Sequence, residues 1–154
     1  MSVPRSAAED PIVQLCVFLA GTEEFAVDLM RVEEILPPQR ITSVPGAPAF
    51  VEGVVNLRGR VIPVLDVRKR LKSGAPPPRF RPKLLVCLVG RRRVGLMVDG
   101  VSEVLRIRKS ALQPAPPLLN AGLKTPHVVG VCGPPDRLRL LFNLKALWSE
   151  GGPA

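Results

Sequence analysis

The chain has 154 residues, 46% of them hydrophobic, with 22 Lys and Arg against 13 Asp and Glu and a net charge of +9. This length suits one globular domain with a substantial core. No apolar run reaches the ~18–20 residues that span a bilayer, and the N-terminus does not resemble a signal peptide. We therefore expect a cytoplasmic protein without membrane insertion.

The residues that enzymes and metal sites need are scarce. His127 is the only histidine, and Cys16, Cys87 and Cys132 form no CxxC pair. A catalytic triad or a zinc site needs more such groups at closer spacing, and no Gly-rich phosphate loop precedes a Lys-Ser/Thr pair. We expect a protein that is not an enzyme, with no catalytic residue, metal or cofactor.

The first part of the chain reads as a leader followed by a hairpin. Residues 1–11 are polar and contain prolines, which is typical of a disordered leader. Apolar runs at 12–19 and 25–29, joined by a Gly-containing turn, predict two strands. Apolar residues then recur at helical spacing, which predicts a short helix over 29–36, ended by two prolines, with Glu34 on its polar side.

The central stretch, 53–71, predicts a strand, a turn and a second strand. Two β-branched runs flank a polar tip, where Gly59 can supply the positive φ of a tight connection. Arg58 is then held at the end of a rigid hairpin. Asp66 follows the second run and is a good N-cap for a short helix over 67–71.

The second half begins after a proline-rich linker at 72–82. Leu144, Leu147 and Trp148 share one face at helical spacing, which predicts a short helix over 144–149, followed by a tail at 151–154. The apolar runs between linker and helix predict strands at 83–89, 94–99, 101–107, 128–131 and 137–142.

The two halves resemble each other. Residues 21–36 align with 90–105 at an offset of 69, and residues 53–67 align with 130–144 at an offset of 77. Agreement of both register and order is what a duplicated β unit leaves behind. We therefore expect a mainly β protein with one domain over 12–150, built from two similar subdomains at 12–71 and 83–148.

One group of charged residues has no obvious structural role. Glu33 and Glu34 lie on the predicted helix, and Asn56, Arg58 and Arg60 lie at the central hairpin. One interpretation is a surface ion pair that adds little stability. However, the corresponding tip of the second half reads Gly-Pro-Pro-Asp, so the fold does not require an arginine there. An arginine at a turn beside apolar residues is also typical of a partner-binding anchor.

The central stretch strongly resembles the signature of the CheW family, the coupling proteins of bacterial chemosensory arrays. Its Asn56-Leu57-Arg58-Gly59 tip and the strands around it carry the match. The resemblance implies a fold of two intertwined five-stranded β-barrels around a shared core. Further motifs similar to that family's are Phe18-Leu-Ala-Gly21, Glu24-Phe25-Ala-Val-Asp28, Val32-Glu-Glu34-Ile35, Val44-Pro45-Gly46, Phe50-Val-Glu-Gly53 and Val94-Gly95-Leu96-Met-Val98-Asp99.

This resemblance implies a non-catalytic adaptor. Its partners would be the cytoplasmic hairpin tip of a methyl-accepting chemoreceptor and the regulatory domain of a CheA-type histidine kinase, with other CheW-like proteins as further candidates. Glu34 and Arg58 would be paired charges near the receptor and kinase contacts, and no residue is assigned to the kinase alone. The receptor-binding groove would be lined by Val32, Ile35, Asn56, Leu57 and Gly59.

Two alternatives stand beside the adaptor. The net charge of +9 also fits a basic β-barrel that binds nucleic acid. The densest basic group, Arg91 to Arg93, lies at a predicted turn, and the chain has no tyrosine for base stacking, so we expect no nucleic-acid partner. The other alternative is a CheW-like domain belonging to a larger kinase or fused regulator.

Overall fold

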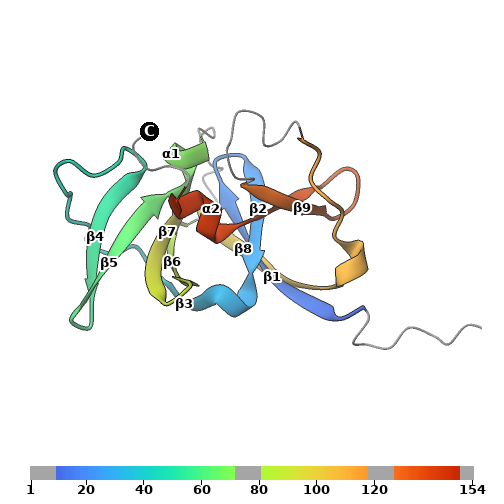
Figure 1. The fold of residues 1–154 in the computed structure, drawn as a ribbon, viewed down its shortest axis with the longest axis horizontal. Coiled ribbons are helices and arrows are strands. Elements are labelled where there is room, and N and C mark those ends of the chain that lie inside the picture. The colour runs from blue at the N-terminus through green and yellow to red at the C-terminus, as the bar shows by residue number, and fades with distance from the viewer. Residues whose placement is uncertain (1–9, 72–80, 118–126, 150–154) are drawn as a thin grey trace, which may run out of the picture.

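The computed structural model describes residues 10–71, 81–117 and 127–149, which form two five-stranded sheets (Figure 1). The strand order is β8-β1-β2-β10-β9 in sheet A and β3-β6-β7-β5-β4 in sheet B. The strands are β1 (Ile12–Ala20), β2 (Glu23–Asp28), β3 (Val32–Leu36), β4 (Val51–Leu57), β5 (Arg60–Asp66), β6 (Lys83–Val89), β7 (Arg92–Val98), β8 (Gly100–Arg108), β9 (Val128–Cys132) and β10 (Arg139–Phe142).

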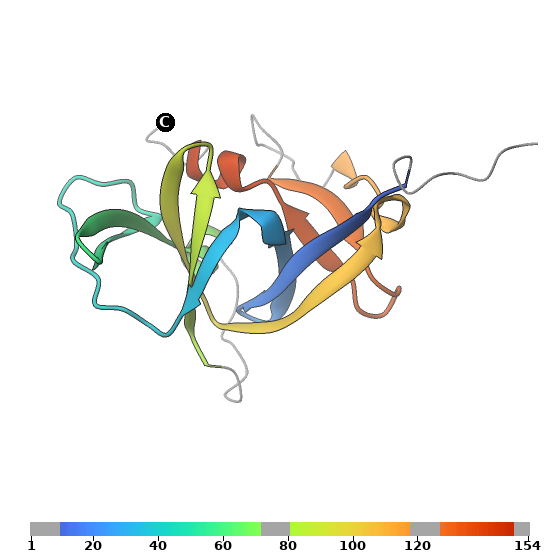
Figure 2. The ribbon, with the colours of Figure 1, turned by 90° about the horizontal axis from the view of Figure 1, so that it is seen from below.

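Each sheet takes strands from both halves of the chain. The β1–β2 hairpin lies in sheet A, but the next strand, β3, crosses to the edge of sheet B. In the same way β6 and β7 lie in sheet B, and β8 crosses to the edge of sheet A (Figure 2). The hairpin β4–β5 of the first half joins β6 and β7 of the second half, through parallel pairing of β5 with β7. Likewise the hairpin β9–β10 joins β1 and β2, through parallel pairing of β10 with β2. The halves are therefore intertwined.

The internal repeat accounts for this arrangement. Exchanging every strand for its counterpart five positions away in the other half converts the order of sheet B into that of sheet A. Local irregularities repeat as well, because the bulge between Val32 and Glu34 in β3 recurs between Val101 and Glu103 in β8. The predicted mainly β fold with two similar, intertwined five-stranded units is confirmed.

Two of the three predicted helices are confirmed. Helix α1 spans Val67–Leu71 and helix α2 spans Leu144–Ser149. Each follows an Asx cap: Asp66 Oδ1 accepts the Lys69 N–H at 3.3 Å, and Asn143 Oδ1 accepts the Ala146 N–H at 3.4 Å. Figure 1 shows α2 in front of the junction between the sheets.

The predicted helix over 29–36 is wrong beyond its first turn. Only Leu29–Arg31 forms a short 3-10 helix, η1, capped by Asp28, and β3 begins at Val32. A second 3-10 turn, η2, spans Lys109–Ala111 after β8. Burial in β3 alternates along the strand, a period-two pattern that antiparallel pairing with β6 imposes. Contact with a distant strand therefore overrides the local helical spacing.

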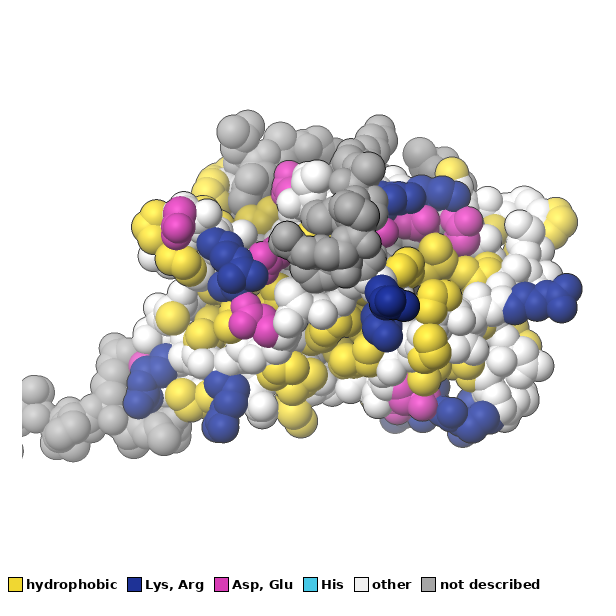
Figure 3. All heavy atoms as spheres, turned by 180° about the vertical axis from the view of Figure 1, so that it is seen from behind, with side chains coloured by type: hydrophobic (Ala, Val, Ile, Leu, Met, Phe, Trp, Pro, Cys, Tyr) yellow, Lys and Arg dark blue, Asp and Glu magenta, His cyan; other side chains and the backbone are white. Residues whose placement is uncertain are grey.

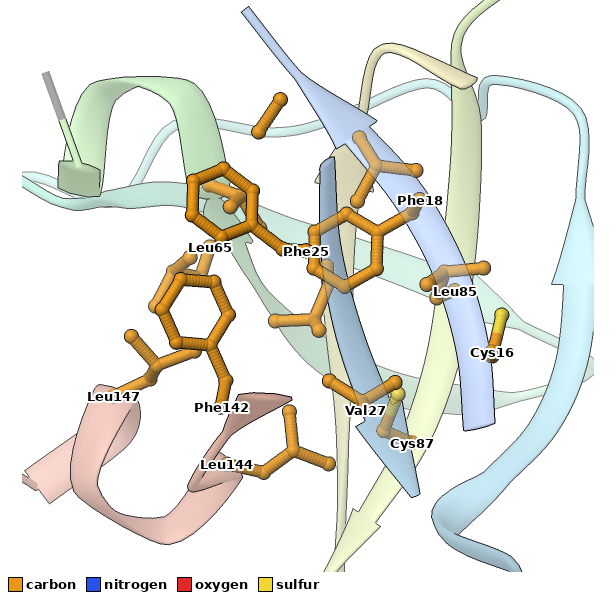
Figure 4. Packing of buried hydrophobic residues seen from close by; sticks show 14 of the residues in the cluster. Cys16, Phe18, Phe25, Val27, Leu65, Leu85, Cys87, Phe142, Leu144 and Leu147 are labelled. Carbon is orange, nitrogen blue, oxygen red and sulfur yellow. The ribbon is translucent and has the colours of Figure 1, made fainter. Parts of the chain in front are cut away.

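The main core lies between the two sheets (Figure 4). Phe18 and Phe25 of sheet A meet Phe142, with the rings of Phe25 and Phe142 stacked at a centroid distance of 4.6 Å. Sheet B contributes Leu65 and Leu85, which are fully buried. Each such side chain stabilises the fold by about 1.5–3 kcal/mol when removed from water. Helix α2 closes the core with the apolar face that the sequence predicts.

The three cysteines are free and buried in strands. Desolvation raises the pKa of the Cys87 thiol to about 12, so this group stays protonated at neutral pH. The cysteines therefore act as small apolar residues, as expected.

Three predicted segments lie at the two ends of the chain and between its halves. The leader at 1–11, the linker at 72–82 and the tail at 151–154 fall wholly or mostly outside the described residues. Within the described ranges, no helix is long and apolar enough to cross a membrane.

Candidate partner-binding site

Arg58 stands at the tip of the β4–β5 hairpin, in a two-residue turn closed by the pair Leu57 and Arg60. Arg58 has a φ of 52° and Gly59 a φ of 83°, and positive φ at both positions is what a type I′ turn requires. The Gly59 N–H donates a 2.9 Å hydrogen bond to Asn56 Oδ1. The predicted role of Gly59 is confirmed, and Asn56 holds the shape of the tip.

Strand β3 brings two glutamates toward this tip. The register shift between Val32 and Glu34 leaves Glu33 in a bulge, and a bulge re-aims side chains. Glu33 and Glu34 consequently line the same pocket, although neighbouring residues of a regular strand point to opposite faces.

Two ion pairs join these glutamates to other strands. Arg58 Nη2 lies 2.5 Å from Glu34 Oε2, and Arg93 Nε lies 2.7 Å from Glu33 Oε1. The first pair links β3 to the β4–β5 tip, which belong to opposite edges of sheet B. The Arg58 side chain is 71% exposed, so the pair contributes little to stability. Its exposure leaves it accessible to a partner.

Together these side chains surround a pocket of about 380 Å³, here called the charged pocket. Apolar side chains form its floor and charged ones its rim. Such an arrangement can bury an apolar side chain of a partner and pair with its polar groups at the rim. The lining residues within the described ranges are Glu33, Glu34, Leu57, Arg58, Arg60, Ile62, Val86 and Arg93.

The electrostatics of the pocket can be tested by titration. The hydrogen bond from Arg58 lowers the pKa of Glu34, against desolvation, with the charges of Arg58 and Arg93 adding to it. Because the pKa of Glu34 is lower in the folded state, the ion pair stabilises the protein fully above the unfolded Glu pKa of about 4.3. This stabilisation is lost as the pH falls through the folded-state pKa of Glu34.

We expect the side-chain carboxyl resonance of Glu34 to titrate below the usual range, and Arg58→Asn to raise its midpoint. Asn tolerates the positive φ of position 58, so the turn is kept. Glu24 is the control: burial alone would raise its pKa, but Arg137 and Arg139 outweigh that effect and lower it, so Arg58→Asn should not change it. An unchanged Glu34 midpoint in the variant would contradict the pairing.

The structure brings together five of the seven residues expected at the receptor site: Asn56, Leu57, Arg58 and Gly59 at the tip, with Glu34 opposite. Of the seven, Glu34, Leu57 and Arg58 line the charged pocket, whereas Asn56, Gly59, Val32 and Ile35 do not. Val32 packs against the main core, and Ile35 is 43% exposed.

Sequence reasoning missed the role of Arg93. We expected the Arg91 to Arg93 run to be a solvated turn, whereas Arg93 pairs with Glu33 and lines the charged pocket. Val104, the repeat counterpart of Ile35, is likewise exposed, at 48%, on β8. Figure 3 shows hydrophobic side chains gathered across the middle of the rear face, with acidic side chains beside basic ones near its rim.

The equivalent end of sheet A is built differently. Arg139 is only 6% exposed along its side chain and pairs with Glu24 and Glu103, the latter being the repeat counterpart of Glu34. Arg137 also pairs with Glu24. Glu103 thus keeps the acidic side chain that Glu34 has in sheet B, but its partner is Arg139, a buried arginine on a strand. The β9–β10 tip has an exposed arginine of its own, Arg137, but it pairs with Glu24 and not with the counterpart of Glu34.

The structure is a mainly β domain with a charged pocket on sheet B. The chain belongs to the CheW-like domain family, whose model matches residues 14–151. It is 36% identical over 137 residues to the probable chemotaxis protein CheW of Rhizobium etli, covering 89% of this chain and 88% of that protein. It is 30% identical to the chemotaxis protein CheW of Klebsiella aerogenes, covering 97% and 89%.

A solved structure shares the fold. The scaffolding protein TtCheW from Thermoanaerobacter tengcongensis superposes with a TM-score of 0.80 and 30% sequence identity, covering 92% of this chain and 95% of that one. This agreement extends the family match from sequence to the arrangement of both sheets.

Proposed function

We propose that this chain is a non-catalytic adaptor of a bacterial chemosensory array, located in the cytoplasm, that couples chemoreceptors to a CheA-type histidine kinase. Membership of the CheW-like family supports this proposal, as do relatives described as chemotaxis and scaffolding proteins. Partners would be the cytoplasmic tip of a methyl-accepting receptor, the regulatory domain of the kinase and other CheW-like proteins.

The observation that carries the proposal is the Arg58–Glu34 pair. A highly exposed arginine is held at a positive φ, at a position where the second half of the repeat has Pro135. The type I′ turn requires this φ but favours Asn, Asp or Gly at the position, so fold stability does not explain an arginine there. A rigidly presented charge beside an apolar floor explains it as a docking anchor.

We assign receptor contact to the charged pocket and to the tip residues Asn56, Leu57, Arg58 and Gly59. Val32 and Ile35 stay in the proposed receptor surface, but neither lines the charged pocket, so a receptor that reaches both must extend beyond the pocket. No residue is assigned to the kinase alone.

Purified chain, a receptor signalling-tip fragment and a CheA regulatory domain should co-elute in size-exclusion chromatography at micromolar concentrations. Arg58→Asn should weaken binding of at least one partner roughly tenfold, or ~1.4 kcal/mol. Arg106→Glu, an exposed arginine on β8, is the control for general charge. If neither partner associates, while an oligonucleotide binds with a steep salt dependence, the nucleic-acid alternative replaces the adaptor.

A further inference from the structure

A second and larger hollow of about 830 Å³ lies where α2 meets β5 and the β6–β7 turn. We call it the α2 groove. Val61, Pro63 and Trp148 give it apolar walls, and Val61 is 66% exposed. An exposed β-branched side chain beside a half-buried indole is the kind of apolar surface that marks a binding site.

The charges of the α2 groove have one sign. Arg60, Arg92, Arg93 and Lys145 line it, and no acidic side chain does so in the described part of the chain. Arg93 forms an ion pair with Glu33, whereas Arg60 and Arg92 form no ion pair with any described residue. The groove therefore has apolar walls and a cationic rim, on which Arg60 and Arg92 have no ion-pair partner within the described ranges.

The indole of Trp148 adds a second observation. Its Nε1–H is buried and has no hydrogen-bond acceptor among the residues that the structure describes. Buried donors without an acceptor are rare in folded proteins and call for an explanation. The N–H has almost no accessible surface, so an occupant of the groove would reach it only after the indole turned.

We propose that the α2 groove docks an acidic amphipathic segment of a partner protein. Its carboxylates would pair with Arg60 and Arg92, and its apolar side chains would lie on Val61 and Trp148. A nucleic acid fits less well, because one half-buried aromatic ring offers no platform for stacking successive bases. This inference goes beyond the proposed function, since it concerns the α2 side of Arg60, Ile62 and Arg93, which the groove shares with the charged pocket, and its test needs neither receptor nor kinase.

The test uses the chain's own fluorescence. Trp148 is the only tryptophan and there is no tyrosine, so emission reports directly on the groove. The probe is an acetylated twelve-residue peptide with Glu and Leu at helical amphipathic spacing. Polyglutamate of equal length and a twelve-nucleotide oligothymidylate serve as comparison ligands. We expect a saturable change of emission with the amphipathic peptide, at least tenfold tighter than with either comparison ligand.

Two variants test the contacts without touching the charged pocket. Arg92→Glu removes a rim charge and Val61→Ser removes an apolar wall, and each should weaken the peptide at least tenfold. Arg106→Glu makes the same charge change elsewhere and should not. Equal weakening by Arg106→Glu, equal binding of polyglutamate or oligothymidylate, or no binding at 100 µM peptide would each overturn the proposal. None of these results bears on receptor or kinase binding, so the two proposals can fail separately.

Discussion

Gly53→Ala is expected to lower the free energy of unfolding by about 3 kcal/mol, measured by chemical denaturation. A Cβ atom at Gly53 would lie 2.2 Å from the backbone oxygen of Thr42. That oxygen cannot simply move away, because Thr42 and Val54 exchange two backbone hydrogen bonds of 2.8 Å. The segment before β4 would have to detach from the hairpin that carries Arg58.

The repeat supplies a matched control. Gly130 is the counterpart of Gly53, and Gln113 and Val131 exchange the corresponding two hydrogen bonds. There a Cβ atom would lie 3.5 Å from the Gln113 backbone oxygen, an ordinary contact. Gly130→Ala should change stability by no more than about 0.5 kcal/mol. Equal losses in the two variants would contradict the close approach at Gly53.

Arg58→Glu is expected to reduce partner affinity by tenfold or more, the largest effect on binding of any change at the tip. The substitution places two carboxylates where Glu34 now holds a guanidinium at 2.5 Å, and it reverses the charge offered to a partner. The midpoint of thermal unfolding should hardly move, because both side chains are solvated. Isothermal titration with the receptor fragment measures the first effect, and calorimetry measures the second.

The double variant, Arg58→Glu with Glu34→Arg, isolates the coupling between the two residues. It should recover part of the affinity that either reversal loses, since the pair can form again in the opposite sense. Strictly additive losses would mean that the two residues act on separate surfaces. A large drop in thermal stability would instead identify the pair as a structural feature.

Local features of the fold could be predicted because local chemistry sets them. Gly59 provides the turn, and Asp66 and Asn143 cap helices within three residues of themselves. The segment 29–36 could not be predicted in this way. Its apolar spacing fits a helix and a strand alike, and pairing of Val32 with Cys87 of the other half decides between them.

The candidate site also contains residues that could be predicted from the sequence and a pair that could not. Glu34 and Arg58 could be singled out because the repeat keeps the acid, as Glu103, but has Pro135 at the position of the arginine. The Glu33–Arg93 pair could not, because the two residues are 60 positions apart and Arg93 stands in a run of three arginines. Only the β3 bulge and the register of sheet B place them at one pocket.

The proposed coupling role is tested most directly by kinase activity in a reconstituted array. Receptor-containing vesicles, a CheA-type kinase and this chain are combined, and phosphate incorporation into the kinase is followed with and without each component. The account predicts that receptors change kinase activity only when the chain is present, and that Arg58→Glu abolishes this dependence while Arg106→Glu preserves it. Receptor control of the kinase that is equally strong without the chain, or unaffected by Arg58→Glu, would contradict the account.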